Sequence, residues 1–121
     1  MINDNFINGA AKLMVAESYT IPSYMAFGSI YGTLGSADTI TSGEFDRNIL
    51  DSKSTNNGTA KFLGSRSSVE AGNQTLQIIG LHNTSTLYSS SNLQVNTLIA
   101  SLIHTTSFDI SAEFWVTFQR I

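Results

Sequence analysis

The sequence predicts a mainly β protein: an antiparallel β-sandwich or jelly-roll-like domain of about six to eight strands, with a short amphipathic helix at its N-terminus. Three observations support this prediction. Apolar and polar residues alternate over 107–121, short apolar runs recur between turn residues, and Ser, Thr and Asn supply most of the polarity. The chain, 1–121, fits a single domain, with the helix and its lead-in at 1–20 and the strands at 22–121.

Composition and charge argue against several classes of function. The net charge of -3 gives no electrostatic attraction to nucleic acid or anionic lipid, and no apolar run approaches the roughly 20 residues of a membrane helix. Cysteine is absent, so disulfides and thiolate metal sites are excluded. Only 12% of the residues are charged, a low share that is common on surfaces that contact neighbouring proteins. We therefore expect no nucleic acid partner and no membrane partner.

The first segment has the pattern of an amphipathic helix. Phe6, Ala10 and Leu13 recur at three- and four-residue spacing behind good N-cap residues, which predicts a helix from about Asn5 to Glu17. Gly9 lies inside this segment and weakens the helix.

The next part of the chain is predicted to be extended. Pro22 enforces an extended entry into a strand over 23–27 that ends at Gly28. The stretch from Gly28 to Gly43, rich in Gly, Ser and Thr, reads as a long surface loop, and 44–50 reads as a short strand.

The second half contains the strongest turn signal. Asn56-Asn57-Gly58 predicts a tight hairpin, because Asn-Gly readily adopts positive φ angles. The segment 75–82 is apolar on both parities, as in a strand that is buried on both faces. A turn at 89–92 then precedes another strand from Leu93 to Ile103.

The closing segment predicts a strand with one dry face and one wet face. Phe108, Ile110 and Phe114 fall on the apolar parity, together with Ala112, Val116 and Phe118. Trp115 breaks the pattern, because it stands among the polar positions. A large aromatic residue on the wet face is either covered by another part of the protein or offered to a partner.

No pattern of residues predicts catalysis. His82 and His104 lie on different predicted segments without a third ligand, so we interpret them as exposed or hydrogen-bonded strand-end residues. Glu44 and Asp46 would share one face of a strand, and with Arg47 beside them we interpret them as a solvated charge cluster. We predict that the protein is not an enzyme and that it uses no cofactor and no metal.

Aromatic residues in polar surroundings are the remaining candidates for a functional surface. Tyr31, Tyr88 and Trp115 can stack on sugar rings, fill a protein interface or cap the core from outside. We take all three as candidate interface residues.

The order of these segments resembles a group of small structural proteins of tailed bacterial and archaeal viruses. The resemblance rests on Pro22-Ser23-Tyr24-Met25-Ala26-Phe27-Gly28, Glu44-Phe45-Asp46-Arg47, Ile79-Gly80-Leu81-His82-Asn83 and a closing strand that ends Phe114-Trp115-Val116-Thr117-Phe118. The chain departs from the group at His82, where an aromatic residue usually follows Gly-Leu, and at Ile79, where an acidic residue is frequent.

This resemblance implies a non-enzymatic accessory protein located in the virion. We expect capsid decoration through symmetric self-association, with a trimer favoured, and binding to the major capsid or tail proteins of the same virion. Two alternatives stay open: a tail- or fibre-associated virion protein, and a carbohydrate- or receptor-binding β-sandwich.

Overall fold

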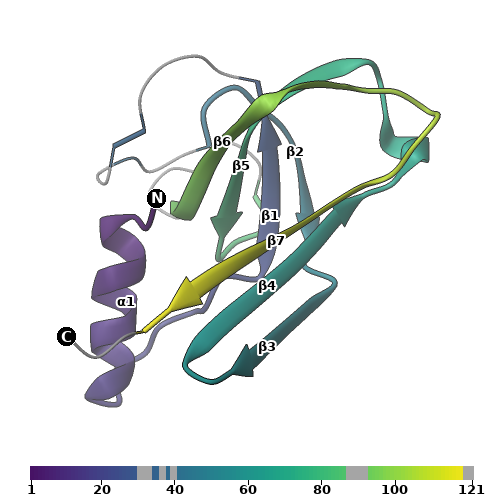
Figure 1. Ribbon diagram of the computed structural model, residues 1–121. Helices are drawn as coiled ribbons and strands as arrows, with labels where there is room; N and C mark the ends of the chain where they lie inside the picture. The colour runs from purple at the N-terminus through teal and green to yellow at the C-terminus, as the bar shows by residue number, and fades with distance from the viewer. Residues whose placement is uncertain (30–33, 36–37, 39–40, 87–92, 119–121) are drawn as a thin grey trace.

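The computed structural model describes residues 1–29, 34–35, 38, 41–86 and 93–118. These residues form seven strands in two antiparallel sheets, with one helix at the N-terminus (Figure 1). The predicted fold class, a mainly β domain of the sandwich type, is confirmed.

The larger sheet has four strands in the order β2-β1-β5-β6. Its strands are β1 (Tyr24–Gly28), β2 (Glu44–Ile49), β5 (Gln74–His82) and β6 (Leu93–His104). The apolar residues of β5 are buried on both faces, as the sequence predicts. One face packs on the other sheet. On the other face, Thr41 from the long loop lies so close to Gly80 that a Cβ there would come within 2.2 Å of the Thr41 hydroxyl oxygen.

The smaller sheet has three strands in the order β3-β4-β7. The strands β3 (Ser52–Asn56) and β4 (Thr59–Arg66) form the hairpin predicted from Asn56-Asn57-Gly58. Asn57 has a φ of 48° and Gly58 a φ of 79°, the left-handed angles that this tight turn requires.

Strand β7 (Ile110–Thr117) pairs with β4 and confirms the alternating pattern of the closing segment as far as Thr117. Phe118, which the pattern places on the dry face, follows the strand and is exposed. Ile110 and Val116 are buried in the core, while Ser111, Glu113 and Trp115 point to the opposite face. The strand starts three residues later than the alternation, because His104 Nε2 bonds to the Phe108 carbonyl oxygen and closes a turn ahead of it.

The core lies between the two sheets and is built from both. Met25 and Phe27 of β1 pack with Phe62 of β4 and Val116 of β7. The chain passes from one sheet to the other at Leu50, whose N–H bonds to the Ser23 carbonyl oxygen at 2.9 Å. The next N–H, of Asp51, bonds to Leu63 of the smaller sheet at 2.8 Å.

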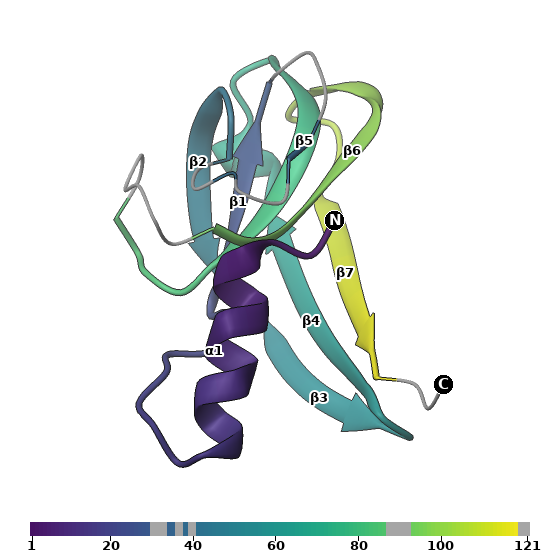
Figure 2. The same cartoon turned by 90° about the vertical axis from the view of Figure 1, so that its left-hand side faces the viewer.

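Helix α1 (Asp4–Met14) stands at one end of the sandwich and packs against β6 (Figure 2). The residues before it extend the sheet, since Asn3 N–H bonds to the Gln94 carbonyl oxygen and Ile2 forms an antiparallel bridge to Val95. The helix ends before the predicted Glu17, because Ala16 adopts a φ of 59° and the Glu17 N–H turns back to the Lys12 carbonyl oxygen.

Gly9 has a packing role in α1. A Cβ on Gly9 would lie 2.0 Å from a ring carbon of Tyr19, whose side chain crosses the helix at this point. The Tyr19 hydroxyl in turn donates a hydrogen bond to the side-chain oxygen of Gln94. Gly9 weakens the isolated helix, but it leaves the space that allows the segment after α1 to pack on the helix.

We predict that Gly9→Ala lowers the free energy of unfolding, although alanine favours helices by about 1 kcal/mol over glycine. The added methyl group must displace the Tyr19 ring. Urea denaturation measures the change. The exposed neighbour Asn8 is the matched control, because Asn8→Ala meets no such contact and should raise stability by a few tenths of a kcal/mol. A gain in stability for Gly9→Ala would contradict this account of the packing.

Candidate interaction surface

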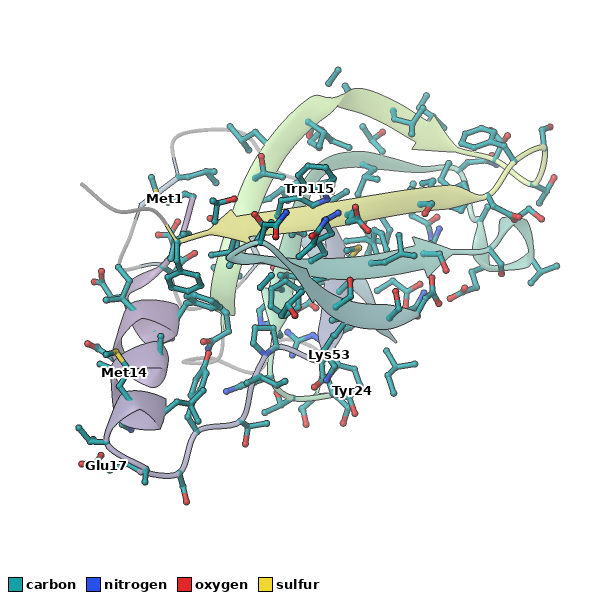
Figure 3. All side chains as sticks on the ribbon, turned by 60° about the horizontal axis from the view of Figure 1, so that its bottom comes forward. Met1, Met14, Glu17, Tyr24, Lys53 and Trp115 are labelled. Atoms are coloured by element: carbon teal, nitrogen blue, oxygen red, sulfur yellow. The ribbon has the colours of Figure 1, made fainter. Side chains whose placement is uncertain are left out.

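Trp115 is exposed on the outer face of the smaller sheet (Figure 3). Its side chain is 63% accessible, although two neighbours hold it in place. The Lys61 ammonium lies 4.4 Å from the ring centroid, and the indole N–H donates a hydrogen bond to the Glu113 carboxylate. Trp115 is therefore oriented by its own sheet and still offers much of its surface.

The other two aromatic candidates, Tyr31 and Tyr88, lie outside the described residues. Trp115 belongs to none of the three hollows described below. A sugar site built around Trp115 would need a concave groove with polar partners. The described residues around it form the face of a three-stranded sheet instead.

The helical end of the molecule carries most of the exposed apolar surface. Fourteen large hydrophobic side chains are exposed among the described residues, and eight of them lie in α1, its flanking segments or the residue after β7. These eight, called the helical-end patch below, are Met1, Ile2, Ile7, Leu13, Met14, Val15, Ile21 and Phe118. The patch arises because the apolar half of α1 is wider than the part that its own sandwich covers, and only Phe6 and Gly9 of the helix are buried.

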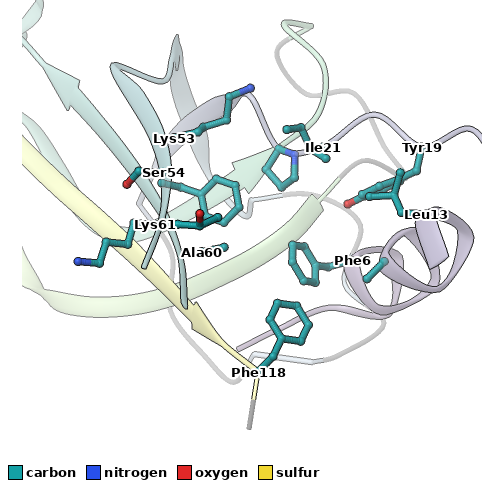
Figure 4. Close-up of a pocket in the computed structure, with 13 residues that line it drawn as sticks. Phe6, Leu13, Tyr19, Ile21, Lys53, Ser54, Ala60, Lys61 and Phe118 are labelled. Carbon is teal, nitrogen blue, oxygen red and sulfur yellow. The ribbon is translucent and has the colours of Figure 1, made fainter. Parts of the chain in front are cut away.

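A groove of about 430 Å³ separates α1 and the segment that follows it from the β3–β4 hairpin (Figure 4). Four aromatic residues line it, Phe6, Tyr19, Phe62 and Phe118, together with Leu13 and Ile21. Lys53 and Lys61 contribute from the hairpin side, and no acidic residue is among the lining residues. We call this hollow the helix–hairpin groove.

A second apolar hollow of about 310 Å³ lies on the other side of Phe118. It is lined by the exposed face of α1, with Ile7, Ala11 and Met14, and by the end of β7. None of its lining residues is charged. The helix is therefore flanked by two apolar hollows, with Phe118 lining both.

A third hollow, of about 490 Å³, is polar. The side chains of Asn5, Asn8, Asn83 and Gln94 line it with Lys12 and Tyr19. Burial raises the pKa of Tyr19 to about 12, so its hydroxyl stays protonated and donates to Gln94. This hydrogen bond holds the segment that follows α1 against strand β6.

The second half of β6 is a further exposed segment. Leu98, Leu102 and Ile103 are exposed on a strand with no charged residue, and β5 is its strand partner. The register of β6 against β5 shifts opposite Gln77, which is a bulge of the kind that bends edge strands away from accidental pairing.

Both histidines are buried and hydrogen-bonded. His82 Nε2 lies 2.7 Å from the Thr41 hydroxyl oxygen. His104 Nδ1 lies 2.7 Å from the Arg66 guanidinium, which can only donate, so Nδ1 accepts and Nε2–H donates to the Phe108 carbonyl oxygen at 2.9 Å. The hydrogen bonding expected of these residues is confirmed, and both are used in holding strands and turns together.

The interpretation of Glu44 and Asp46 as a solvated charge cluster is wrong. Glu44 forms a bidentate ion pair with Arg47 at 2.7 and 2.8 Å, and each side chain is 1% exposed. Asp46 bonds instead to Arg66 at 2.8 Å. A register shift between Phe27 and Gly28 breaks the regular alternation of β2, and the two carboxylates engage different arginines.

The described residues contain no cluster of three or more His, Cys, Asp or Glu side chains that could bind a metal. In the same part of the chain, no helix is long and apolar enough to cross a membrane.

The helical-end patch was not singled out by sequence reasoning. The spacing of Ile7, Ala10 and Met14 shows that α1 has a broad apolar face, but this pattern is the same whether the face is covered or open. Where the sandwich ends relative to the helix is set by tertiary structure. The parity of Trp115 correctly places it on the outer face of β7, whereas its exposure, which the sequence leaves open, is established by the structure.

Comparison with known proteins returns no relative: no protein-family model matches the chain, and neither a curated protein nor a solved structure does.

We predict that Arg66→Met lowers the free energy of unfolding by about 3 kcal/mol, because it leaves buried His104 Nδ1 without a donor and Asp46 without its cation. Lys61→Met, on the same strand, is the matched control and should cost less than about 1 kcal/mol, since Lys61 contributes an exposed cation–π contact. Equal losses in urea denaturation would contradict a structural role for the Arg66 network.

We predict that Glu70 makes the free energy of unfolding depend on pH in the acid range. Burial raises the pKa of Glu70, but hydrogen bonds from the Ser67 backbone, Asn48 and the Ser67 hydroxyl lower it by more, so the pKa lies below its usual value of 4.5. The folded state is therefore stabilised above the unfolded-state pKa, and this contribution is lost as pH falls through the folded-state pKa. Unfolding curves from pH 7 to 3 should show a shallower acid loss for Glu70→Gln than for the unchanged protein. The same loss of stability with falling pH in both proteins would contradict this role of Glu70.

Proposed function

We propose that the protein is a non-enzymatic structural subunit that binds copies of itself and the surface of a larger particle. The observation that carries this proposal is the helical-end patch, which gathers eight exposed large hydrophobic side chains at one end of a small domain. Exposed apolar surface on this scale marks a contact site, because a free monomer would leave it in water.

The low charge of the chain supports the same function. With 12% charged residues, and with Arg47 and Arg66 engaged in internal ion pairs, the described surface is unusually free of the charges that keep monomers apart. Interface cores are depleted in charge and enriched in aromatic residues and Met. Met14 and Phe118 in the patch, and Trp115 on the smaller sheet, fit this composition.

The particle that we propose is the virion of a tailed bacterial or archaeal virus, with capsid decoration as the role. This part of the proposal rests on the resemblance of the strand motifs to small virion proteins. Both histidines form hydrogen bonds within the fold, and the exposed surface is rich in apolar side chains. These two observations support a binding role over a catalytic one. A symmetric trimer is the assembly that we expect, with the major capsid or tail proteins as further partners.

We predict that the purified chain at micromolar concentration has a mass in light scattering that is a small multiple of one chain, with three copies favoured. Burial of the helical-end patch supplies the driving force, because apolar area removed from water stabilises by about 25 cal/mol per Å². The double substitution Ile7→Ser with Phe118→Ser should shift the population towards monomer. The matched control is Val69→Ser, which removes an even more exposed apolar side chain from outside the patch. A monomeric mass at every concentration tested would contradict self-association.

A further inference from the structure

The last turn of α1 forms a projecting tip that combines apolar side chains with a carboxylate. Met14 is 88% exposed and Val15 is 67% exposed, and Glu17 is exposed next to them (Figure 3). We call these three residues the helix tip.

The helix tip is closed by a specific backbone motif. The Glu17 N–H bonds to the Lys12 carbonyl oxygen at 2.8 Å and the Ala16 N–H to the Leu13 carbonyl oxygen at 3.2 Å, which is the Schellman pattern. The left-handed position is occupied by Ala16, with a φ of 59°, where glycine is usual and alanine is strained. The motif turns the chain back at Glu17, so this acidic residue lies at the same end of the helix as Met14 and Val15.

The helix–hairpin groove has the complementary chemistry. Its lining is largely apolar and aromatic, and Lys53 and Lys61 line its hairpin side. The Lys61 ammonium lies over the Trp115 ring, so Lys53 is the lysine that we assign to a docked carboxylate. The Lys53 ammonium bonds to a neutral group, the exposed Ser23 hydroxyl, at 3.1 Å. It can exchange this partner for a carboxylate at little cost, because both groups are already in water.

We infer that the helix tip of one copy docks into the helix–hairpin groove of a second copy. Met14 and Val15 enter the apolar groove, and Glu17 pairs with Lys53 on its rim. This inference rests on the proposed self-association and names the surface through which it occurs. A second copy is favoured as the occupant because its helix tip complements the groove in two ways. Its apolar side chains fit the apolar lining, and its carboxylate is opposite in charge to the lysine on the rim.

The symmetry of such a contact follows from its two different halves. The tip and the groove are distinct patches, so the contact is heterologous and each copy can use both patches at once. A heterologous contact that closes on itself produces a ring. This arrangement is compatible with the expected trimer and gives each copy the same pair of contacts.

A charge-reversal cycle tests the inference through the dissociation constant of self-association, measured by sedimentation. We expect Glu17→Lys and Lys53→Glu each to weaken association about tenfold, since each places like charges together across the contact. The double variant, Glu17→Lys with Lys53→Glu, restores the opposite pair and should return the constant to within about threefold of the original. Both side chains are exposed, so the fold should be retained, and circular dichroism checks this for every variant.

Two further variants separate this contact from other surfaces. Met14→Asp should weaken association by more than tenfold, because it places a charge in the apolar groove, and no charge change at Lys53 should rescue it. Thr106→Lys, in the exposed turn between β6 and β7, adds the same charge away from the tip and the groove and should leave the constant unchanged. Self-association that none of the tip and groove variants weakens, or single reversals that the double variant fails to rescue, would overturn the inference and leave the proposed assembly function standing. An unchanged protein that stays monomeric would overturn both.

Discussion

Helix α1 has an apolar face that extends past the edge of the sandwich on which the helix stands. Phe6 anchors it in the core, and the segment before it is hydrogen-bonded to β6, so the helix cannot turn its remaining apolar residues inward. Ile7, Leu13 and Met14 are consequently exposed, and a hollow opens on each side of the helix. The apolar surface, the groove and the proposed contact all follow from this fixed position.

Ion pairs inside the fold fix the sheets on which the helix stands. Arg66 joins Asp46 of β2 to His104 at the end of β6, and the Arg47–Glu44 pair ties down the strand next to β1. These charges are satisfied within the fold, and removing a partner from such buried pairs is costly. The sheets are therefore a rigid base, and the contacts with neighbours are left to apolar side chains and to exposed charges such as those of Glu17 and Lys53.

The sequence predicts those features that depend on local pattern. Turn chemistry and strand parity are local properties. The sequence therefore predicts the hairpin at Asn57-Gly58, the two faces of β7 and the outward position of Trp115. The buried pairing of Glu44 was missed, since its burial depends on tertiary structure around β2. The Arg66–His104 bond joins residues 38 positions apart, and no spacing rule indicates it. The open side of α1 was missed for the same reason.

The oxidation rates of the methionines test most directly whether the helix tip is covered in the assembled protein. The chain has three methionines, and Met25 is fully buried while Met14 is the most exposed. Dilute peroxide converts accessible methionine to the sulfoxide, which mass spectrometry locates residue by residue. We expect Met14 to be oxidised quickly in dilute, dissociated protein and slowly in the assembled form, with Met25 protected in both. Equal oxidation of Met14 in the two forms would contradict burial of α1 between copies.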